Sequence, residues 1–171
     1  MKINIGGEAK KEGWINYNVQ KKPNVDIVGN INDLSQFKNE SIEEIYASHI
    51  IEHVDQKSIK NTFKDIFRIL KKKGKFYVSV PDMDVLCHFF VSPLANKKIK
   101  FHTMRMIFGG QVDNFDYHYF GWNYEFMNDY LLEAGFIEIR KVDSFGLFDD
   151  TSNYKPYGFP ISLNVVAIKK W

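Results

Sequence analysis

The chain has 171 residues and a mass of 20.1 kDa, which suits one domain built on one core (1–171) and leaves no room for a second full domain. Hydrophobic residues make up 44% and charged residues 26%, which excludes a disordered or fibrous chain. The 23 basic and 21 acidic side chains leave a net charge of +2, so charge gives no indication of a nucleic acid or membrane partner.

The cysteine content and the N-terminal residues indicate where the protein works. Cys87 is the single cysteine, so an internal disulfide and a zinc site built on several thiolates are both excluded. The first residues lack the apolar core of a signal peptide, and no apolar stretch approaches the roughly 20 residues that span a bilayer. We therefore expect a cytoplasmic protein.

Short strands are predicted in the first third of the chain, where apolar and polar residues alternate between glycines. They cover residues 2–5, 14–18, 25–28 and 42–48. The first helix is predicted to begin at Asp55, which is a good N-cap, and to end at the lysines 71–73 and Gly74.

The rest of the chain alternates helices with strands. Strands are predicted at 75–80, 136–142 and 162–169, and helices at 85–90, at 99–108 and from the Asn123 cap to Gly135. This order predicts an α/β sheet with helices on its faces. Ligands bind such sheets beyond the carboxyl ends of the strands, so the residues that end each strand are the candidates for a site.

Gly6 and Gly7 follow the first strand. A residue without Cβ lets a ligand approach the backbone closely. The dinucleotide fingerprint needs three spaced glycines and a helix N-terminus, which the run from Ile5 to Glu8 does not supply. A nicotinamide cofactor is therefore disfavoured.

The run from His49 to His53 matches the H-x-x-E-H pattern of zinc peptidases. That chemistry needs both histidines on one helix, yet the motif directly follows the strand at 42–48, and Asp55 marks a later helix start. We therefore expect no metal ion here. We expect His49 to face the ligand cleft and His53 to form a local hydrogen bond.

The densest aromatic segment is 115–126, where seven of the twelve residues are aromatic. We expect four of these to pack in the core: Phe120, Trp122, Tyr124 and Phe126. Asp116, Tyr117 and His118 alternate titratable groups with rings, which favours a site, with His118 as a general base and Asp116 orienting it.

Taken in order, these segments resemble the class I methyltransferases dependent on S-adenosylmethionine, in particular the small type 11-like bacterial group often found with polysaccharide genes. The resemblance spans nearly the whole chain and rests on INIGGE, GWINYN, VDIVGNINDLSQF, SIEEIYASHIIEHV, FKDIFRILKKKGKFYVSVPD, MIFGGQVDNFDYHYFGW and LLEAGFIEIRKV. It implies a Rossmann-like sheet, mostly parallel with an antiparallel terminal strand and with helices on both faces.

The resemblance also implies the cofactor, S-adenosylmethionine, and the residues that bind it. Gly6 and Gly7 would lie against its methionine part. Asn18 stands where the family places the acid that holds the ribose. The remaining implied positions are Asn30, Asn32, Asp33 and Leu34 near the adenine, and Ser48 and His49 along the cleft. Residues 84–122 would form a lid or insertion on the acceptor side.

Three residues depart from the family pattern. Asn18 and Asn30 replace expected acids, which should cost on the order of 1 kcal/mol in cofactor binding because a charge-assisted hydrogen bond is lost. Glu8 could repel the cofactor carboxylate or attract its ammonium and sulfonium charges, and the sequence leaves both alternatives open.

The resulting prediction is a methyltransferase that acts on an oxygen or nitrogen of a small polar acceptor, with a sugar or polysaccharide precursor among the candidates. We expect substrate positioning to contribute more to catalysis than proton removal. The catalytic candidates are His118, Asp82 and Asp116, and His102 is a further candidate of lower rank. The strand end lacks the Asn/Asp-Pro-Pro-aromatic motif of DNA amino-methyltransferases. We expect neither nucleic acid nor membrane as partner, and self-association stays open. The alternative is a methyltransferase-like domain that has lost catalysis and serves as a binding or assembly module.

Overall fold

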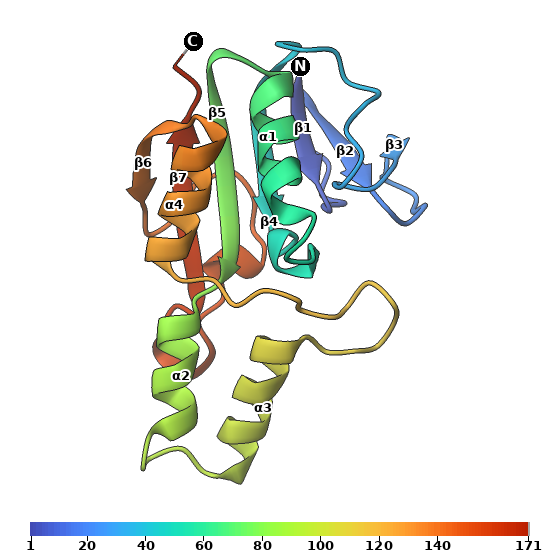
Figure 1. The fold of residues 1–171 in the computed structure, drawn as a ribbon. Coiled ribbons are helices and arrows are strands. Elements are labelled where there is room, and N and C mark those ends of the chain that lie inside the picture. Colours follow the sequence, from blue (N-terminus) through green and yellow to red (C-terminus); the bar gives the residue numbers. More distant parts are fainter. Residues whose placement is uncertain (171) are drawn as a thin grey trace.

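The computed structural model describes residues 1–170 and forms one seven-stranded sheet in the order β3-β2-β1-β4-β5-β7-β6 (Figure 1). The strands are β1 Lys2–Ile5, β2 Trp14–Asn18, β3 Ile27–Val28, β4 Ile42–Ser48, β5 Leu70–Pro81, β6 Ile137–Lys141 and β7 Ser162–Ile168. Strands β1 to β5 are parallel, and β7 runs antiparallel to both β5 and β6. The predicted mostly parallel sheet with an antiparallel terminal strand is confirmed.

Within residues 1–170, four α-helices and three 3-10 turns connect the strands. They are η1 Ile51–His53, α1 Ile59–Ile69, α2 Met83–Val91, α3 Lys97–Phe108, α4 Tyr124–Ala134, η2 Thr151–Asn153 and η3 Pro156–Gly158. Asn123 caps α4 as predicted, because its side chain accepts the Phe126 N–H, and Gly135 ends the helix with a left-handed φ of 104°. Within residues 1–170, no helix combines the length and the apolar character needed to cross a bilayer.

Both ends of α1 differ from the prediction. The Asp55 carboxylate caps the turn before the helix by accepting the N–H groups of Lys57 and Ser58, and α1 itself begins at Ile59. Leu70 pairs with Ile42 of β4, so the lysines that follow belong to β5 and not to the helix. Lys73 (φ 62°) takes the left-handed conformation assigned to Gly74.

The core lies between the sheet and the helices α1 and α4, which pack side by side in Figure 1. Phe63 of α1 packs edge-on against Phe76 of β5, which also contacts Phe136. Side chains alternate along a strand, so Tyr46 faces the other side, where Phe145 and Phe148 of the segment 142–161 cover it. Helices and short helical turns thus cover both faces.

The segment 84–122 lies at the carboxyl ends of the parallel strands. Helices α2 and α3 project from this edge, and the chain then returns across it to α4 (Figure 1). The Met83 N–H donates to the Trp122 carbonyl, which fixes the return. Trp122 is buried in the core as predicted, and Phe120 and Tyr124 are partly buried against it. Phe126 was wrongly assigned to the core: it is 51% exposed, on the outer side of the first turn of α4.

Candidate active site

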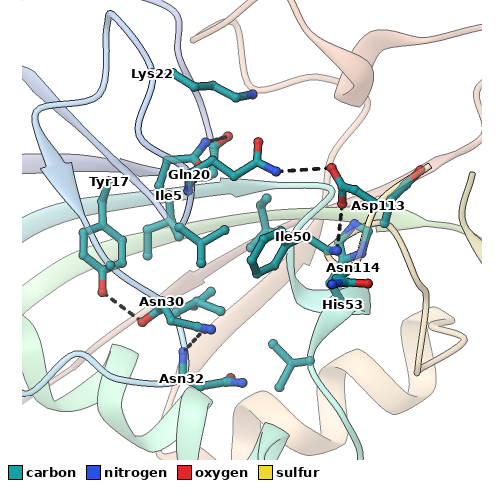
Figure 2. A pocket seen from close by; sticks show the side chains of 18 of the residues that line it. Ile5, Tyr17, Gln20, Lys22, Asn30, Asn32, Ile50, His53, Asp113 and Asn114 are labelled. Atoms are coloured by element: carbon teal, nitrogen blue, oxygen red, sulfur yellow. Dashed lines mark hydrogen bonds between the residues drawn. The ribbon is translucent and has the colours of Figure 1, made fainter. Parts of the chain in front are cut away.

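A pocket of about 480 Å³ opens at the carboxyl ends of β1, β2 and β3, with the loop 112–116 as its opposite wall (Figure 2). This volume is within the range of small-molecule sites. Among the predicted cofactor residues, Gly6, Asn18, Asn30 and Asn32 line the pocket. Asp116 is the one catalytic candidate that lines it.

Gly6 occupies a position that only glycine fits. Its φ is +80°, and a Cβ there would lie 1.9 Å from Cδ1 of Ile50. The Gly6 N–H donates to the Tyr17 carbonyl over 2.7 Å, so the loop is tied to β2. Gly7 does not line the pocket: a Cβ there would lie 2.1 Å from Nδ2 of Asn4, so this glycine makes room for a buried side chain.

The Asn18 amide holds the glycine loop in place. Its Nδ2–H donates to the Gly6 carbonyl over 2.7 Å, and its Oδ1 accepts the Gln20 N–H over 2.9 Å. An aspartate could make only the second bond, since it has no donor when ionised. The sequence analysis treated Asn18, in place of an acid, as a weakened contact to the ribose. In the structure, this asparagine also stabilises the glycine loop.

Glu8 forms an ion pair with Lys22, and Lys22 lines the pocket while Glu8 does not. The negative charge of Glu8 is therefore compensated by Lys22 within the protein. The sequence left open whether Glu8 repels the cofactor carboxylate or attracts its ammonium and sulfonium groups, and in the structure its carboxylate is already paired.

The adenine-side residues divide into two groups. Asn30 and Asn32 line the pocket; Asn30 Oδ1 accepts the Asn32 N–H, and Asn32 Oδ1 accepts the Thr62 hydroxyl, each over 3.0 Å. Leu34 is fully buried in the core. The Asp33 carboxylate is exposed and accepts hydrogen bonds from Ser35, which lower its pKa. The last two residues therefore shape the loop from outside the pocket.

The loop after α3 closes the pocket opposite the strands. Gln20 Nε2 donates to Asp113 Oδ2 over 3.2 Å, as Figure 2 shows, and links the end of β2 to this loop. Several wall residues were not among the predicted site residues: Gln20, Lys22, Ile50, His53, Asp113 and Phe115. They come from segments far apart in the chain, and no spacing pattern joins them.

His49 lies at the end of β4 with a left-handed φ of 54°, so no helix runs through the H-x-x-E-H motif, as predicted. Its Nε2 contacts the Ser162 hydroxyl at 2.8 Å and its Nδ1 lies 3.3 Å from Glu52 Oε1. Neither His49 nor Ser48 lines the pocket. The predicted local hydrogen bond of His53 is present, from Nδ1 to the Tyr117 carbonyl at 3.0 Å.

Glu52 is the most unusual residue of the site. Its side chain is 1% exposed, and neither carboxylate oxygen accepts a hydrogen bond of normal geometry from residues 1–170. Burial raises the pKa of this carboxyl, but the interaction with His49 and the charges of His53 and His118 outweigh burial and lower it below its usual value. The site thus holds a buried carboxylate among histidines.

His118 lies in this cluster, with its ring centroid 4.7 Å from that of His53. Burial lowers the pKa of His118, the Glu52 charge opposes this, and the charges of His53 and His49 add to the lowering. His118 is therefore a neutral imidazole at neutral pH. The carboxylate beside it is Glu52, because Asp116 Oδ2 accepts the Val112 N–H instead.

The other predicted acceptor-side groups have structural partners. Asp82 is buried; its Oδ1 caps α2 by accepting the Asp84 N–H, and its Oδ2 pairs with Lys141 Nζ at 3.1 Å. His102 contacts the Tyr157 hydroxyl at 2.7 Å from α3. Neither residue lines the pocket.

Comparisons with known proteins agree with this architecture. A family model described as methyltransferase domain matches residues 5–78. No curated protein matches the sequence significantly.

Solved structures with the same fold cover nearly the whole chain. A SAM-dependent methyltransferase from Archaeoglobus fulgidus is 15% identical, with 98% of this chain and 85% of that chain covered and a TM-score of 0.62. A possible histamine N-methyltransferase from Thermotoga maritima is 19% identical, with 99% and 82% covered and a TM-score of 0.61.

A third similar structure contains ligands. It is the 1,6-didemethyltoxoflavin-N1-methyltransferase of Burkholderia thailandensis with bound 1,6-didemethyltoxoflavin and S-adenosylhomocysteine, 11% identical, with 99% of this chain and 71% of that chain covered and a TM-score of 0.61. At these identities the structures establish the fold, and the family model adds the match in sequence. The chain thus has the fold of the class I methyltransferases dependent on S-adenosylmethionine, with a sequence match to a methyltransferase domain over residues 5–78, fewer than half of the chain.

Proposed function

We propose that the pocket binds S-adenosylmethionine and that the protein transfers its methyl group to an oxygen or nitrogen of a small polar acceptor. The observation that carries this proposal is the place of the pocket: it lies at the carboxyl ends of β1, β2 and β3, where an open α/β sheet binds its ligand. The left-handed backbone of Gly6 supports it, because this glycine lets the chain turn at the strand end that borders the pocket, where Ile50 packs against it.

The wall residues fit the chemical groups of this cofactor. The Asn18 and Gln20 amides stand at the end of β2, where hydroxyl groups of a ribose would bind. Asn30 and Asn32 supply polar groups at the end of β3 for the adenine. Lys22 also lines the pocket, with its charge paired to Glu8. The bound cofactor would supply a methyl group on a sulfonium. A nucleophile can attack this methyl carbon in line with the carbon–sulfur bond, and S-adenosylhomocysteine is then the leaving group.

His118 and Glu52 are the candidate acceptor-side residues. The neutral His118 imidazole can accept the proton that the acceptor loses, and Glu52 can stabilise the imidazolium that forms. Substrate alignment by the pocket supplies most of the acceleration, because displacement from a sulfonium needs little covalent help from the protein. The alternation of rings and polar groups in 115–119 supports a polar ring as acceptor, such as a sugar, whose apolar face can lie on Phe115 or Tyr119.

Calorimetry with S-adenosylmethionine and S-adenosylhomocysteine tests the binding step. We expect both to bind with one site per chain at micromolar concentration. No heat of binding at millimolar ligand would contradict the proposal. Formation of S-adenosylhomocysteine with a panel of sugars, sugar nucleotides and small amines then tests the transfer. Binding without turnover on any of them would favour the alternative of a binding or assembly module.

A further inference from the structure

The cluster around Glu52 has the composition of a metal site. Glu52, His53 and His118 each offer one ligand atom, and these three atoms lie within 4.8 Å of one another. The carboxylate is almost fully buried without a normal hydrogen bond from residues 1–170, which is costly for a charged group unless a cation or a donor compensates it. His53 borders the pocket, so an ion has a path to the cluster.

Hydrogen bonds to the backbone fix the ring orientations of His53 and His118, an arrangement that is common for metal-binding histidines. His53 Nδ1–H donates to the Tyr117 carbonyl, which leaves Nε2 free to bind an ion. The ring of His118 is hydrogen-bonded to the backbone of Ile107, so one of its nitrogens also stays free. Metal-binding histidines commonly donate their second N–H to a backbone carbonyl, which fixes the ring and its tautomer.

Main-chain contacts join the two segments that carry these ligands. The Tyr119 N–H donates to the Glu52 carbonyl over 2.8 Å, and the His118 N–H donates to the Phe108 carbonyl over 3.2 Å. The loop is thus attached directly to η1, although His118 and His53 are 65 positions apart in the sequence. The ligand set is therefore largely formed before any ion binds.

We propose that Glu52, His53 and His118 bind a divalent first-row transition-metal ion such as Zn²⁺, Mn²⁺ or Co²⁺. Two imidazole nitrogens and one carboxylate favour these metals over Mg²⁺ and Ca²⁺, which prefer oxygen ligands. Ligand atoms around a tetrahedral ion lie roughly 3.4 Å apart, so side-chain movements of about 1 Å close the site. The proposal departs from the expectation that the H-x-x-E-H segment holds no metal.

His49, the first histidine of that motif, is a positioning residue and not a ligand. The Ser162 hydroxyl donates to the Thr151 carbonyl, so it accepts from His49 Nε2–H. This bond holds the His49 ring with its Nδ1 3.3 Å from Glu52 Oε1, and Nδ1 donates to the carboxylate only when the ring is protonated. The site uses the motif's glutamate and second histidine and takes its third ligand from the loop.

A bound ion would occupy the His118 nitrogen that otherwise accepts a proton. The two roles of His118 therefore exclude one another, and the metal experiment separates them. The ion would keep open positions toward the pocket, where an acceptor oxygen could bind; this last role rests on the proposed function. Metal binding itself is measured without S-adenosylmethionine, so it can fail or succeed independently of methyl transfer.

The experiment is a titration of the full, untagged chain with Co²⁺ and Zn²⁺ by absorption spectroscopy and calorimetry. The background variant Cys87→Ser/His88→Ala removes an exposed thiol and an exposed imidazole outside the cluster. We expect one ion per chain with micromolar affinity in the wild type and in this background. His118→Ala and Glu52→Gln should each weaken binding at least tenfold.

Thermal unfolding keeps the result interpretable. If Zn²⁺ binds the native state, the midpoint of wild-type unfolding rises with Zn²⁺ concentration, and this shift is absent in a His118→Ala variant that folds normally. Two outcomes overturn the proposal: no uptake by the wild type at millimolar Co²⁺ and Zn²⁺, or equal uptake by the wild type and both cluster variants. His53→Ala serves as a further cluster variant should Glu52→Gln unfold.

Discussion

The strand-end wall of the pocket and the neighbouring cluster of Glu52, His53 and His118 differ in how far their polar groups are satisfied. At the strand ends, the amides of Asn18, Asn30 and Asn32 all take part in hydrogen bonds with the protein. On the side of η1, both oxygens of the buried Glu52 carboxylate lack such bonds. The strand-end wall is a scaffold that fixes a shape for the cofactor. The cluster holds a buried carboxylate beside histidines, and titratable groups in such an environment are typical of functional sites.

The largest expected effect comes from the cluster of Glu52, His53 and His118. His118→Ala should lower kcat for methyl transfer by about 10²- to 10⁴-fold, because it removes either a general base or a metal ligand. The affinity for S-adenosylmethionine should stay within about twofold. Steady-state kinetics and calorimetry measure both, with His88→Ala on α2 as the matched control. An unchanged kcat would remove His118 from the reaction.

The pH dependence of kcat sharpens the same point. Burial lowers the pKa of His118 below its usual 6.5, and only the neutral ring can accept a proton or bind an ion. The rate should therefore be on its plateau at neutral pH and should fall only as the pH drops through the lowered pKa of His118. A rate that already falls above pH 6.5 would contradict this assignment.

Gly6 tests whether the strand-end wall is as rigid as its contacts indicate. Gly6→Ala combines a left-handed backbone with a Cβ that meets Ile50, and should lower the free energy of unfolding by roughly 2–5 kcal/mol. Gly13→Ala is the matched control: its φ is +78° with no atom within 4 Å, so it should cost only roughly 1–2 kcal/mol. Urea unfolding measures both. Equal losses would show that the contact with Ile50 is unimportant.

The contrast between the strand-end wall and the cluster also explains what the sequence could predict. The bounds of β1, β2 and β4 match the prediction because alternation and glycine breaks are local signals. The strand-end asparagines were found for the same reason. Glu52 and His118 were not joined, since their contact depends on the path of the loop after α3, which no local pattern encodes. Asp82 looked like a free carboxylate at a strand end, but its partner Lys141 comes from β6.

Asn18→Asp separates the family expectation from the observed contacts. An acid at this position would restore the charge that the family uses for the ribose, but it would also remove the donor to the Gly6 carbonyl. Loss of this bond should lower the free energy of unfolding by about 1–2 kcal/mol and weaken cofactor binding several-fold. Asn18→Ser is a comparison that keeps a donor without the charge. Tighter binding by Asn18→Asp in calorimetry would show that the charge matters more than the loop.

The smallest effect is expected where the two sides of the pocket meet. Gln20 and Asp113 are joined by one exposed hydrogen bond, so a double-mutant cycle of Gln20→Ala and Asp113→Ala should give a coupling energy below about 1 kcal/mol in unfolding. The same cycle applied to S-adenosylmethionine affinity should give a larger coupling if the bond closes the loop over the ligand. Equal coupling in unfolding and in binding would mean that the loop 112–116 keeps its place without the cofactor, as part of the same scaffold as the strand ends.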